Sequence, residues 1–246
     1  MSAAPVWPQG YGKIAHQELD STNDEARRMA EAGEAGPLWI TAARQTAGRG
    51  RRGKVWDCGA GNLAASLLLR PKAPEAVIGQ LSFVAALAVA DMVAQFAPAA
   101  VIEVKWPNDV LGGGKKLAGI LLESGRDGHG FWLVIGIGVN LADFPQGTEF
   151  PATSLAQLCG ASPPSDIALC LLAARFAHWY DVWMSLGFEI VRTAWLARAA
   201  SLGGPIRARL PHETREGVFE GIDARGALLL NEQGRLRAIA AGEVFF

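Results

Sequence analysis

The stretch "AGRGRRGK" at residues 47–54 constrains the fold most, because it spells two phosphate-binding motifs and satisfies neither. Its glycines match G-x-G-x-x-G, and the same letters contain G-x-x-x-x-G-K. A dinucleotide-binding fingerprint needs a helix directly after the glycines, and a P-loop needs Ser or Thr after the lysine. Here Val55 follows the lysine, and the chain breaks at Gly59 before it resumes as an extended run. We therefore reject a doubly wound dinucleotide-binding fold and a P-loop fold.

The segments around this loop predict a strand on each side of it. "PLWITAARQ" precedes the loop and "NLAASLLLRP" follows it, and both are short apolar runs bounded by turn residues. Upstream, "LDSTNDEARRMAEAG" predicts a helix in which Thr22 and Glu25 form a capping box and Gly33 marks the end. The basic loop is thus predicted to connect two strands.

Downstream, helices and strands continue to about residue 200, where the pattern changes. "PEAVIGQLSFVAALAVADMVAQF" and "SDIALCLLAARFAHWYDVWMSLGF" predict helices, and "FWLVIGIGVNL" predicts a strand. "VIEVKWPNDVL" and "KKLAGILLES" predict a hairpin around "GGG". From Ser201 onward, short alternating runs separated by turns predict a small β-barrel. The expected architecture is α+β, a mixed sheet with helices over residues 1–200, followed by an all-β domain over residues 201–246.

Composition limits the classes of function. The formal net charge is −1, whereas a general nucleic-acid-binding protein usually carries a broad basic excess. Three cysteines without C-x-x-C spacing and four scattered histidines predict a reducing compartment and no metal site. The start "MSAAPVWPQG" has no signal-peptide pattern, and the run "FVAALAVA" is much shorter than the ~20 residues that cross a bilayer. These features predict a soluble, cytoplasmic protein without membrane contact.

Several polar residues stand where a ligand could meet them. Arginine guanidinium groups of the loop can pair with phosphate or carboxylate oxygens, and Trp56 could stack on a ring, although a mobile surface loop explains the same letters equally well. In "KWPND", Lys105 ends a strand beside Trp106 and is expected to be partly desolvated, which suits charge neutralisation at a reacting phosphate. In "GIGVN", the glycines would let a ring pack against the backbone. No sequence pattern of a nucleophilic catalyst is present.

Taken together, "STN", "RQTAGRGRRGKVW", "KWPNDV", "KKLAGILLE" and "GIGVNL" resemble the bacterial biotin protein ligases. "GPIRARL", "EGVFEGIDARGALLL" and "GEV" are similar to the SH3-like C-terminal domain of that family. The resemblance implies a biotin/lipoate ligase-like catalytic domain that uses ATP, biotin and Mg²⁺. Biotin's carboxylate would attack the α-phosphorus of ATP to give biotinyl-5′-AMP. The biotinyl group would then pass to a lysine of a biotin carboxyl carrier domain, such as that of acetyl-CoA carboxylase.

The resemblance also implies roles for individual residues, with no protein ligand to a metal. Lys105 and Arg51 would be catalytic. Residues implied to bind biotin are Ser21, Thr22, Asn23, Gln45, Arg49, Gly50, Arg51 and Lys105. Residues implied to bind ATP or the adenylate are Arg49, Arg51, Arg52, Trp56, Lys105, Asn108, Lys116, Gly119 and Asn140.

Other functions remain to be weighed at this stage. A lipoate–protein ligase would share the fold and the adenylation chemistry, but "GRGRRG" and "KWPND" favour biotin. A nucleic-acid-binding module would use the basic loop, which the near-neutral charge disfavours. A docking scaffold would leave "STN", Gln45 and Lys105 unexplained. The ligase motifs begin by about residue 19, so we expect no DNA-binding helix-turn-helix domain and no specific DNA binding. Whether the chain forms a homodimer is left open.

Overall fold

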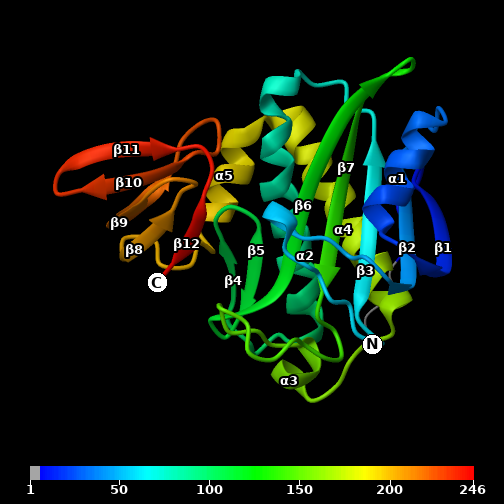
Figure 1. Cartoon of the computed structure of the whole chain (residues 1–246), viewed down its shortest axis with the longest axis horizontal. Coiled ribbons are helices and arrows are strands. Elements are labelled where there is room, and N and C mark those ends of the chain that lie inside the picture. Colours follow the sequence, from blue (N-terminus) through cyan, green and yellow to red (C-terminus); the bar gives the residue numbers. More distant parts are fainter. Residues whose placement is uncertain (1–5) are drawn as a thin grey trace.

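The computed structural model describes residues 6–246, so the first five residues of the N-terminal segment lie outside the described part. The strands form a seven-stranded mixed sheet in the order β1-β2-β3-β7-β6-β5-β4 and a second, five-stranded sheet (Figure 1). The strands of the first sheet are β1 (Gly12–Leu19), β2 (Leu38–Gln45), β3 (Leu63–Leu69), β4 (Ile102–Lys105), β5 (Asp109–Gly112), β6 (Lys115–Asp127) and β7 (Gly130–Val139). In this sheet β1 and β2 pair in parallel, and the other neighbours are antiparallel.

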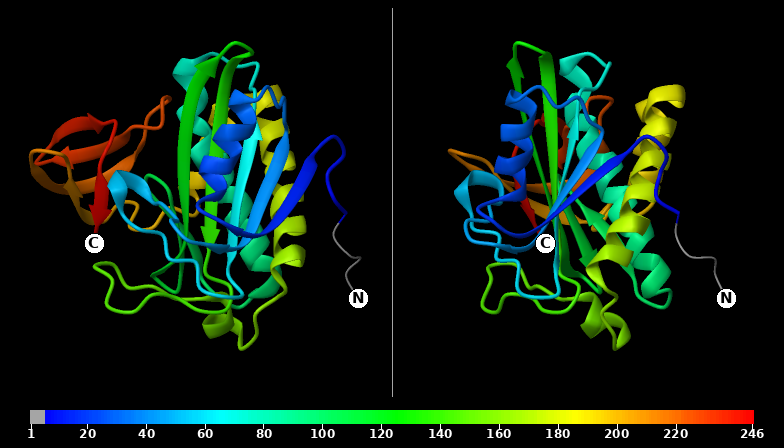
Figure 2. Two further views of the ribbon diagram at one scale, coloured as in Figure 1. Left: turned by 45° about the vertical axis from the view of Figure 1, so that its right-hand side comes forward. Right: turned by 90° about the vertical axis from the view of Figure 1, so that its right-hand side faces the viewer.

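Helices cover the two faces of this sheet unequally. The α-helices are α1 (Thr22–Glu31), α2 (Leu81–Phe96), α3 (Leu155–Cys159), α4 (Ser165–Leu186) and α5 (Phe188–Leu196). The two longest, α2 and α4, lie together on one face, whereas α1 and the loop after β2 lie on the other (Figure 2). Two 3₁₀ turns, Arg51–Gly53 and Glu75–Gln80, complete the helical segments. The helical face therefore forms the main core, and much of the opposite face is left for loops and the second sheet.

Alternation along β7 explains why the two faces differ. Side chains of a strand point alternately to opposite faces. Ile135, Ile137 and Val139 are buried in the main core cluster with α2 and α4. Gly136 and Gly138, between them, have no side chain to cover the other face. The strand that "FWLVIGIGVNL" predicts is thus confirmed, and its glycines leave one face of the sheet bare.

The apolar helical segment is longer than the run "FVAALAVA" that the sequence analysis compared with a membrane span. Glu75–Phe96 is 22 residues long and apolar enough to cross a membrane by composition, but 72% of its most apolar window is buried inside the fold. Leu87 is fully buried in it, and Trp39 of β2 packs edge to face on Phe176 of α4 with centroids 6.0 Å apart. This helix is the core helix of a globular domain, which agrees with the expectation of a soluble protein.

One local expectation was wrong and another was incomplete. The helix that contains Thr22 and Glu25 does form, but its N-cap is Ser21 and makes no side-chain capping hydrogen bond. The Thr22 hydroxyl instead donates to Gln45 Oε1 at 3.1 Å, so the capping box is absent. The segment "VIEVKWPNDVL" is two strands, β4 and β5, which pair with each other around Trp106. It therefore contains a hairpin of its own, in addition to the expected one at "GGG" between β5 and β6.

The predicted small β-domain is an antiparallel sheet in the order β11-β10-β9-β8-β12. Its strands are β8 (Pro205–Arg209), β9 (Thr214–Ile222), β10 (Leu228–Glu232), β11 (Arg235–Ile239) and β12 (Glu243–Phe245). It joins the large domain through hydrogen bonds from buried polar side chains, such as Trp106 Nε1 to Gly226 O at 3.0 Å. Gln80 Nε2 donates to Ala224 O at 3.1 Å, beside that contact. The last strand, β12, thereby comes to lie near the bare face of the large sheet (Figure 1).

We expect Leu87→Ala to lower the free energy of unfolding by about 2–5 kcal/mol, because it leaves a cavity among fully buried side chains. Leu186→Ala is the matched control, since Leu186 is 65% exposed at the end of α4 and should change stability by less than about 0.5 kcal/mol. Urea unfolding followed by circular dichroism measures both. Equal losses in the two variants would contradict this description of the core.

Candidate active site

One cavity of about 410 Å³ opens on the bare face of the large sheet. Its walls come from α1, the basic loop, the strands β3, β6 and β7, the β4–β5 turn, the segment after β7 and the last strand β12. Pockets of this size, with apolar walls and a few convergent polar groups, are typical ligand sites. The cavity is therefore the candidate active site.

The basic loop is folded into a narrow hairpin over the cavity. Trp56 N donates to Gly48 O at 3.0 Å, and Gly50 N donates to Lys54 O at 2.7 Å. A side chain on Gly48 would collide with the Trp56 carbonyl, so this position requires glycine. Arg52 at the tip has φ 54° and is exposed. Gly48 therefore allows the two stretches of backbone to approach each other closely, and Arg49 and Arg51 of this hairpin line the cavity.

A polar pocket lies at the start of α1. Gln45 Oε1 accepts hydrogen bonds from the Thr22 backbone N at 2.8 Å and from the Thr22 hydroxyl at 3.1 Å. The fully buried Ser66 Oγ lies 2.8 Å from Thr22 Oγ1 and donates to Asn23 Oδ1 at 2.6 Å. Asn23 Nδ2 in turn donates to Glu123 Oε2 at 2.6 Å. These bonds hold donors and acceptors of three strands and one helix in fixed directions at one end of the cavity.

A flat platform forms the middle of the cavity. Gly119 of β6 and Gly138 of β7 are cross-strand partners, and the indole of Trp56 lies on them so closely that a methyl group on Gly138 would overlap the ring. The buried Trp56 Nε1 has no hydrogen-bond partner among residues 6–246. Asn140, at the end of β7, is 2% exposed, and its Nδ2 donates to Thr153 O at 3.0 Å. The platform therefore offers a ring surface bordered by amide groups.

Lys105 is a buried cation at the cavity wall. It ends β4 with 7% of its side chain exposed, and its Nζ lies 3.7 Å from Asp109 Oδ2. The other oxygen, Asp109 Oδ1, lies 2.7 Å from Lys116 Nζ. Burial lowers the pKa of Lys105, an effect that Asp109 opposes and Lys116 reinforces. The expected desolvation of Lys105 is thus present, and two ammonium groups share one carboxylate.

The two cavity-lining arginines of the loop differ in their partners. Arg49 is paired with Asp24 at 2.8 Å and with Glu123 at 3.0 Å. Arg51 has no carboxylate within 4.0 Å among residues 6–246, and its Nη1 donates to Asn108 Oδ1 at 3.2 Å. Burial lowers the pKa of Arg51, and the charge of Arg52 adds to this. Arg51 is therefore a partly desolvated guanidinium whose charge is not neutralised.

Most residues proposed from the sequence meet at this cavity. The proposed residues that line it are Ser21, Thr22, Asn23, Gln45, Arg49, Gly50, Arg51, Trp56, Lys105, Asn108, Lys116, Gly119 and Asn140. Arg52 does not line it.

The sequence interpretation did not propose several other residues of the site. Ser66 and Glu123 hold the polar pocket, Asp109 links the two lysines, and Phe150 and Phe245 line the cavity near Lys105. Asp109 is the last residue of the motif "KWPND", so a sequence signal for it was present. The two aromatic residues stand in no recognisable motif.

Two protein-family models match the chain. Residues 16–140 match the biotin/lipoate A/B protein ligase family, and residues 201–246 match the biotin protein ligase C-terminal domain. Together they include the cavity residues from Ser21 to Asn140 and the whole five-stranded sheet.

Curated relatives and solved structures agree with these matches. The chain is 47% identical to a biotin–[acetyl-CoA-carboxylase] ligase of Paracoccus denitrificans over 92% of this chain and 97% of that one. It is 35% identical to a bifunctional ligase/repressor of Bacillus subtilis over 96% of this chain and 74% of that one. A biotin protein ligase from Aquifex aeolicus, solved with biotin and ATP, superposes with a TM-score of 0.83 at 28% identity, covering 95% of this chain and 97% of that one. A ligase from Leishmania major with biotinyl-5-AMP gives 0.67 at 26% identity, with 94% and 99% covered.

The cysteine beside the cavity gives a test of the loop's geometry. Burial raises the pKa of Cys58 to about 11, and the adjacent Asp57 adds to this. At pH 8 its thiolate fraction should be roughly a hundredfold below that of an ordinary thiol. We expect iodoacetamide to modify the exposed Cys159 much faster than Cys58, with the Cys58 rate rising steadily toward pH 11. Peptide mass spectrometry measures both rates, and equal rates in urea are the control. Rapid labelling of Cys58 at pH 8 in the folded protein would contradict the buried position.

Proposed function

The chain belongs to the biotin/lipoate A/B protein ligase family, and we propose that it activates biotin with ATP and transfers the biotinyl group to a lysine of a carrier domain. One observation supports this most strongly. A single cavity is lined by the polar pocket, by the ring platform and by the cations Lys105 and Arg51. A biotin head, an adenine ring and the acyl phosphate that connects them need these three environments.

In this proposal the chain divides at about residue 200, with residues 1–200 as the catalytic domain and 201–246 as the C-terminal domain. The cytoplasm is the proposed location, supported by the globular fold and the buried core helix. The acceptor is a biotin carboxyl carrier domain, as the name of the Paracoccus relative suggests for that protein.

The polar pocket is proposed to bind the ureido ring of biotin. Such a ring needs hydrogen-bond donors and acceptors within about 3 Å of its own polar atoms. A pocket built to form these hydrogen bonds strongly disfavours a ligand that lacks them. Ser21, Thr22, Asn23 and Gln45 supply them, and Ser66 keeps Thr22 and Asn23 in place. Lipoate has no ureido group, so this pocket favours biotin over lipoate.

The cavity-lining cations Lys105 and Arg51 are proposed to serve the first reaction step. A biotin carboxylate oxygen attacks the α-phosphorus of ATP, and the bond from that phosphorus to pyrophosphate breaks. Negative charge concentrates on the phosphoryl oxygens, where Lys105 and Arg51 stabilise it in a water-poor site. Arg49 and Gly50 lie in the same loop and would contact the carboxylate end of biotin.

The platform is proposed to hold the adenylate. Gly119 and Gly138 let the Trp56 indole lie against the sheet, and this indole and Asn140 would border the adenine. The contacts proposed for the ribose and phosphates are Asn108 and Lys116. Arg52, which the sequence interpretation included, is exposed and has no proposed contact here.

Mg²⁺ is proposed to arrive with ATP. Among residues 6–246 no group of three His, Cys, Asp or Glu side chains is arranged to hold a metal ion, and Asp109 is already paired with lysine. The phosphate oxygens of ATP would therefore be the main ligands of the ion, which would neutralise part of their charge. In the second step the acceptor lysine nitrogen attacks the acyl carbon, AMP leaves, and a proton passes to solvent.

Pyrophosphate exchange into ATP tests the proposal. The assay is run with Mg²⁺ and with biotin, with lipoate, or with no acid. We expect exchange with biotin alone. Exchange with lipoate alone would replace the substrate but keep the adenylation chemistry. Absence of exchange with either acid would refute the proposed function, and salt-dependent nucleic-acid binding without ATP would then be the next measurement.

We expect Arg51→Gly to keep the fold and to release biotinyl-5′-AMP early. The substitution removes charge-assisted hydrogen bonds to the adenylate, so dissociation should become roughly tenfold to a hundredfold faster. Retention of radiolabelled adenylate on rapid gel filtration measures this, and circular dichroism checks the fold.

Arg52→Gly is the neighbouring comparison. Glycine is well tolerated at its φ of 54°, and the side chain does not line the cavity. We expect adenylate retention close to that of the unmodified protein. A loss as large as that of Arg51→Gly would show that the whole loop, not the Arg51 guanidinium, retains the adenylate.

A further inference from the structure

Lys105 is a buried ammonium near Asp109, and Glu243 acts on it from farther away. Asp109 is the carboxylate within 4.0 Å of its Nζ among residues 6–246, and that carboxylate lies closer to Lys116, at 2.7 Å rather than 3.7 Å. A cation in a water-poor site needs other electrostatic stabilisation. The surroundings of Lys105 other than Asp109 therefore matter for its charge and position.

Three phenylalanine rings surround the other side of this ammonium. Lys105 Nζ lies 3.9 Å from the ring centroid of Phe150, 5.6 Å from that of Phe245 and 6.0 Å from that of Phe246. These distances are within the range of cation–π attraction. Phe246 also packs edge to face on Phe150, with centroids 5.6 Å apart and planes at 85°. The rings are thus arranged around the cation and against each other.

The rings come from two distant parts of the chain that ion pairs hold together. Phe150 follows Glu149 in the segment between β7 and α3, and Glu149 Oε2 accepts from Arg209 Nη1 at 3.2 Å. Phe245 belongs to β12, where Glu243 Oε1 lies 2.9 Å from Lys54 Nζ of the basic loop. These exposed pairs contribute little stability, but they join the three segments at the cavity mouth.

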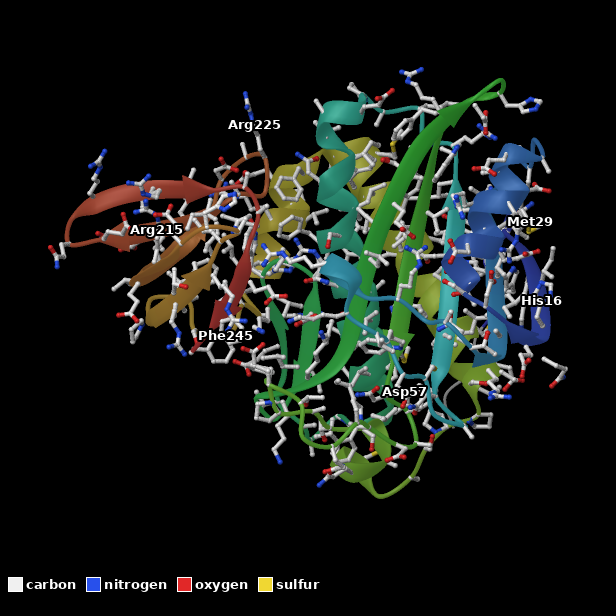
Figure 3. All side chains as sticks on the ribbon, in the orientation of Figure 1. His16, Met29, Asp57, Arg215, Arg225 and Phe245 are labelled. Carbon is white, nitrogen blue, oxygen red and sulfur yellow. The ribbon has the colours of Figure 1, made fainter. Side chains whose placement is uncertain are left out.

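Phe245 also contacts arginine side chains of the small domain. The guanidinium carbon of Arg209 lies 4.3 Å from its ring centroid and that of Arg207 lies 6.0 Å away, so both arginines and Lys105 are near this ring. Figure 3 shows Phe245 at the edge of the small sheet that is nearest to the large domain. The small domain therefore brings two of its rings, Phe245 and Phe246, close to Lys105.

We propose that Phe150 and Phe245 are positioning residues for Lys105, which hold its ammonium by their ring faces and direct it toward the reacting phosphate. This inference rests on the proposed adenylation function. An aromatic face attracts a cation without carrying a negative charge, whereas a carboxylate in the same place would repel the phosphates and the biotin carboxylate. The rings therefore orient the ammonium and leave its positive charge available to the transition state.

The alternative is that the rings merely fill space between the two domains. Fluorine substitution separates the two explanations, because it weakens the negative ring face with little change of ring size. If the rings act electrostatically, kcat should fall stepwise as fluorine atoms are added. If they only fill space, kcat should not change with fluorination. The same logic distinguishes Phe150→Leu, which removes the ring, from Phe144→Leu, which makes the same substitution in the same segment outside the cavity.

The first measurement is an NMR experiment that does not require enzymatic activity. Protons above a ring face are shifted upfield, so the ε-methylene protons of Lys105 should resonate upfield in a spectrum of protein labelled with [ε-¹³C]lysine. Lys105→Arg assigns the signal. We expect the shift to be lost in Phe150→Leu, reduced in Phe245→Leu and kept in Phe144→Leu. An ordinary lysine shift in the unmodified protein would refute the cluster.

The second measurement is biotin-dependent pyrophosphate exchange with mono-, di- and trifluorophenylalanine placed at position 150 by amber suppression. We expect kcat to fall stepwise, by roughly fivefold to thirtyfold over the series, with the KM for biotin unchanged. A flat kcat across the series refutes positioning through the ring face. If the unmodified protein shows no exchange with biotin, the proposed function fails, whereas the NMR shift still decides whether the rings hold the ammonium.

Discussion

The site depends on the alternation of large and absent side chains along β7. A sheet in a protein of this size must cover both faces, and here isoleucine and valine side chains from β7 pack under α2 and α4. Gly136 and Gly138 face the other way, next to Gly119 of the neighbouring strand. Because glycine has no side chain, the backbone of this part of the sheet must be covered by other segments of the chain or by a ligand. In this structure Asn23, Trp56 and the cavity itself occupy that space.

The charged groups around the cavity differ in how they are paired, and the nearby carboxylates each have a basic partner. Arg49 is paired with Asp24 and Glu123, and Lys116 is paired with Asp109. Arg51 has amide and carbonyl partners, and Lys105 has aromatic ones. Arg51 and Lys105 are therefore the cavity-lining cations with the weakest carboxylate pairing among these four. An anionic reactant gains most from these two, since Arg51 has no carboxylate within 4.0 Å among residues 6–246 and Lys105 has a longer contact with Asp109, at 3.7 Å.

The sequence predicted those parts of the molecule that depend on neighbours along the chain. The strand β7, the core helix and the desolvation of Lys105 follow from alternation, apolar runs and the aromatic neighbour at the strand end. The capping box failed because the Thr22 hydroxyl donates to Gln45, which lies far away in sequence and adjacent in the sheet. Ser66 and Phe245 escaped notice for the same reason, since their partners are 43 or more residues away and no local pattern marks such a contact.

The small domain lies beside the face of the large sheet that the helices α2 and α4 do not cover. Its hydrogen bonds to Trp106 and Gln80 fix it beside the β4–β5 turn, so that β12 ends next to Lys105. A loop alone would leave the ammonium exposed to water, which weakens its interaction with a phosphate by a large factor. The last strand supplies the missing wall with Phe245 and binds the basic loop through Glu243. The position of the basic loop and the burial of Lys105 are thereby linked through β12, so a change in one should alter the other.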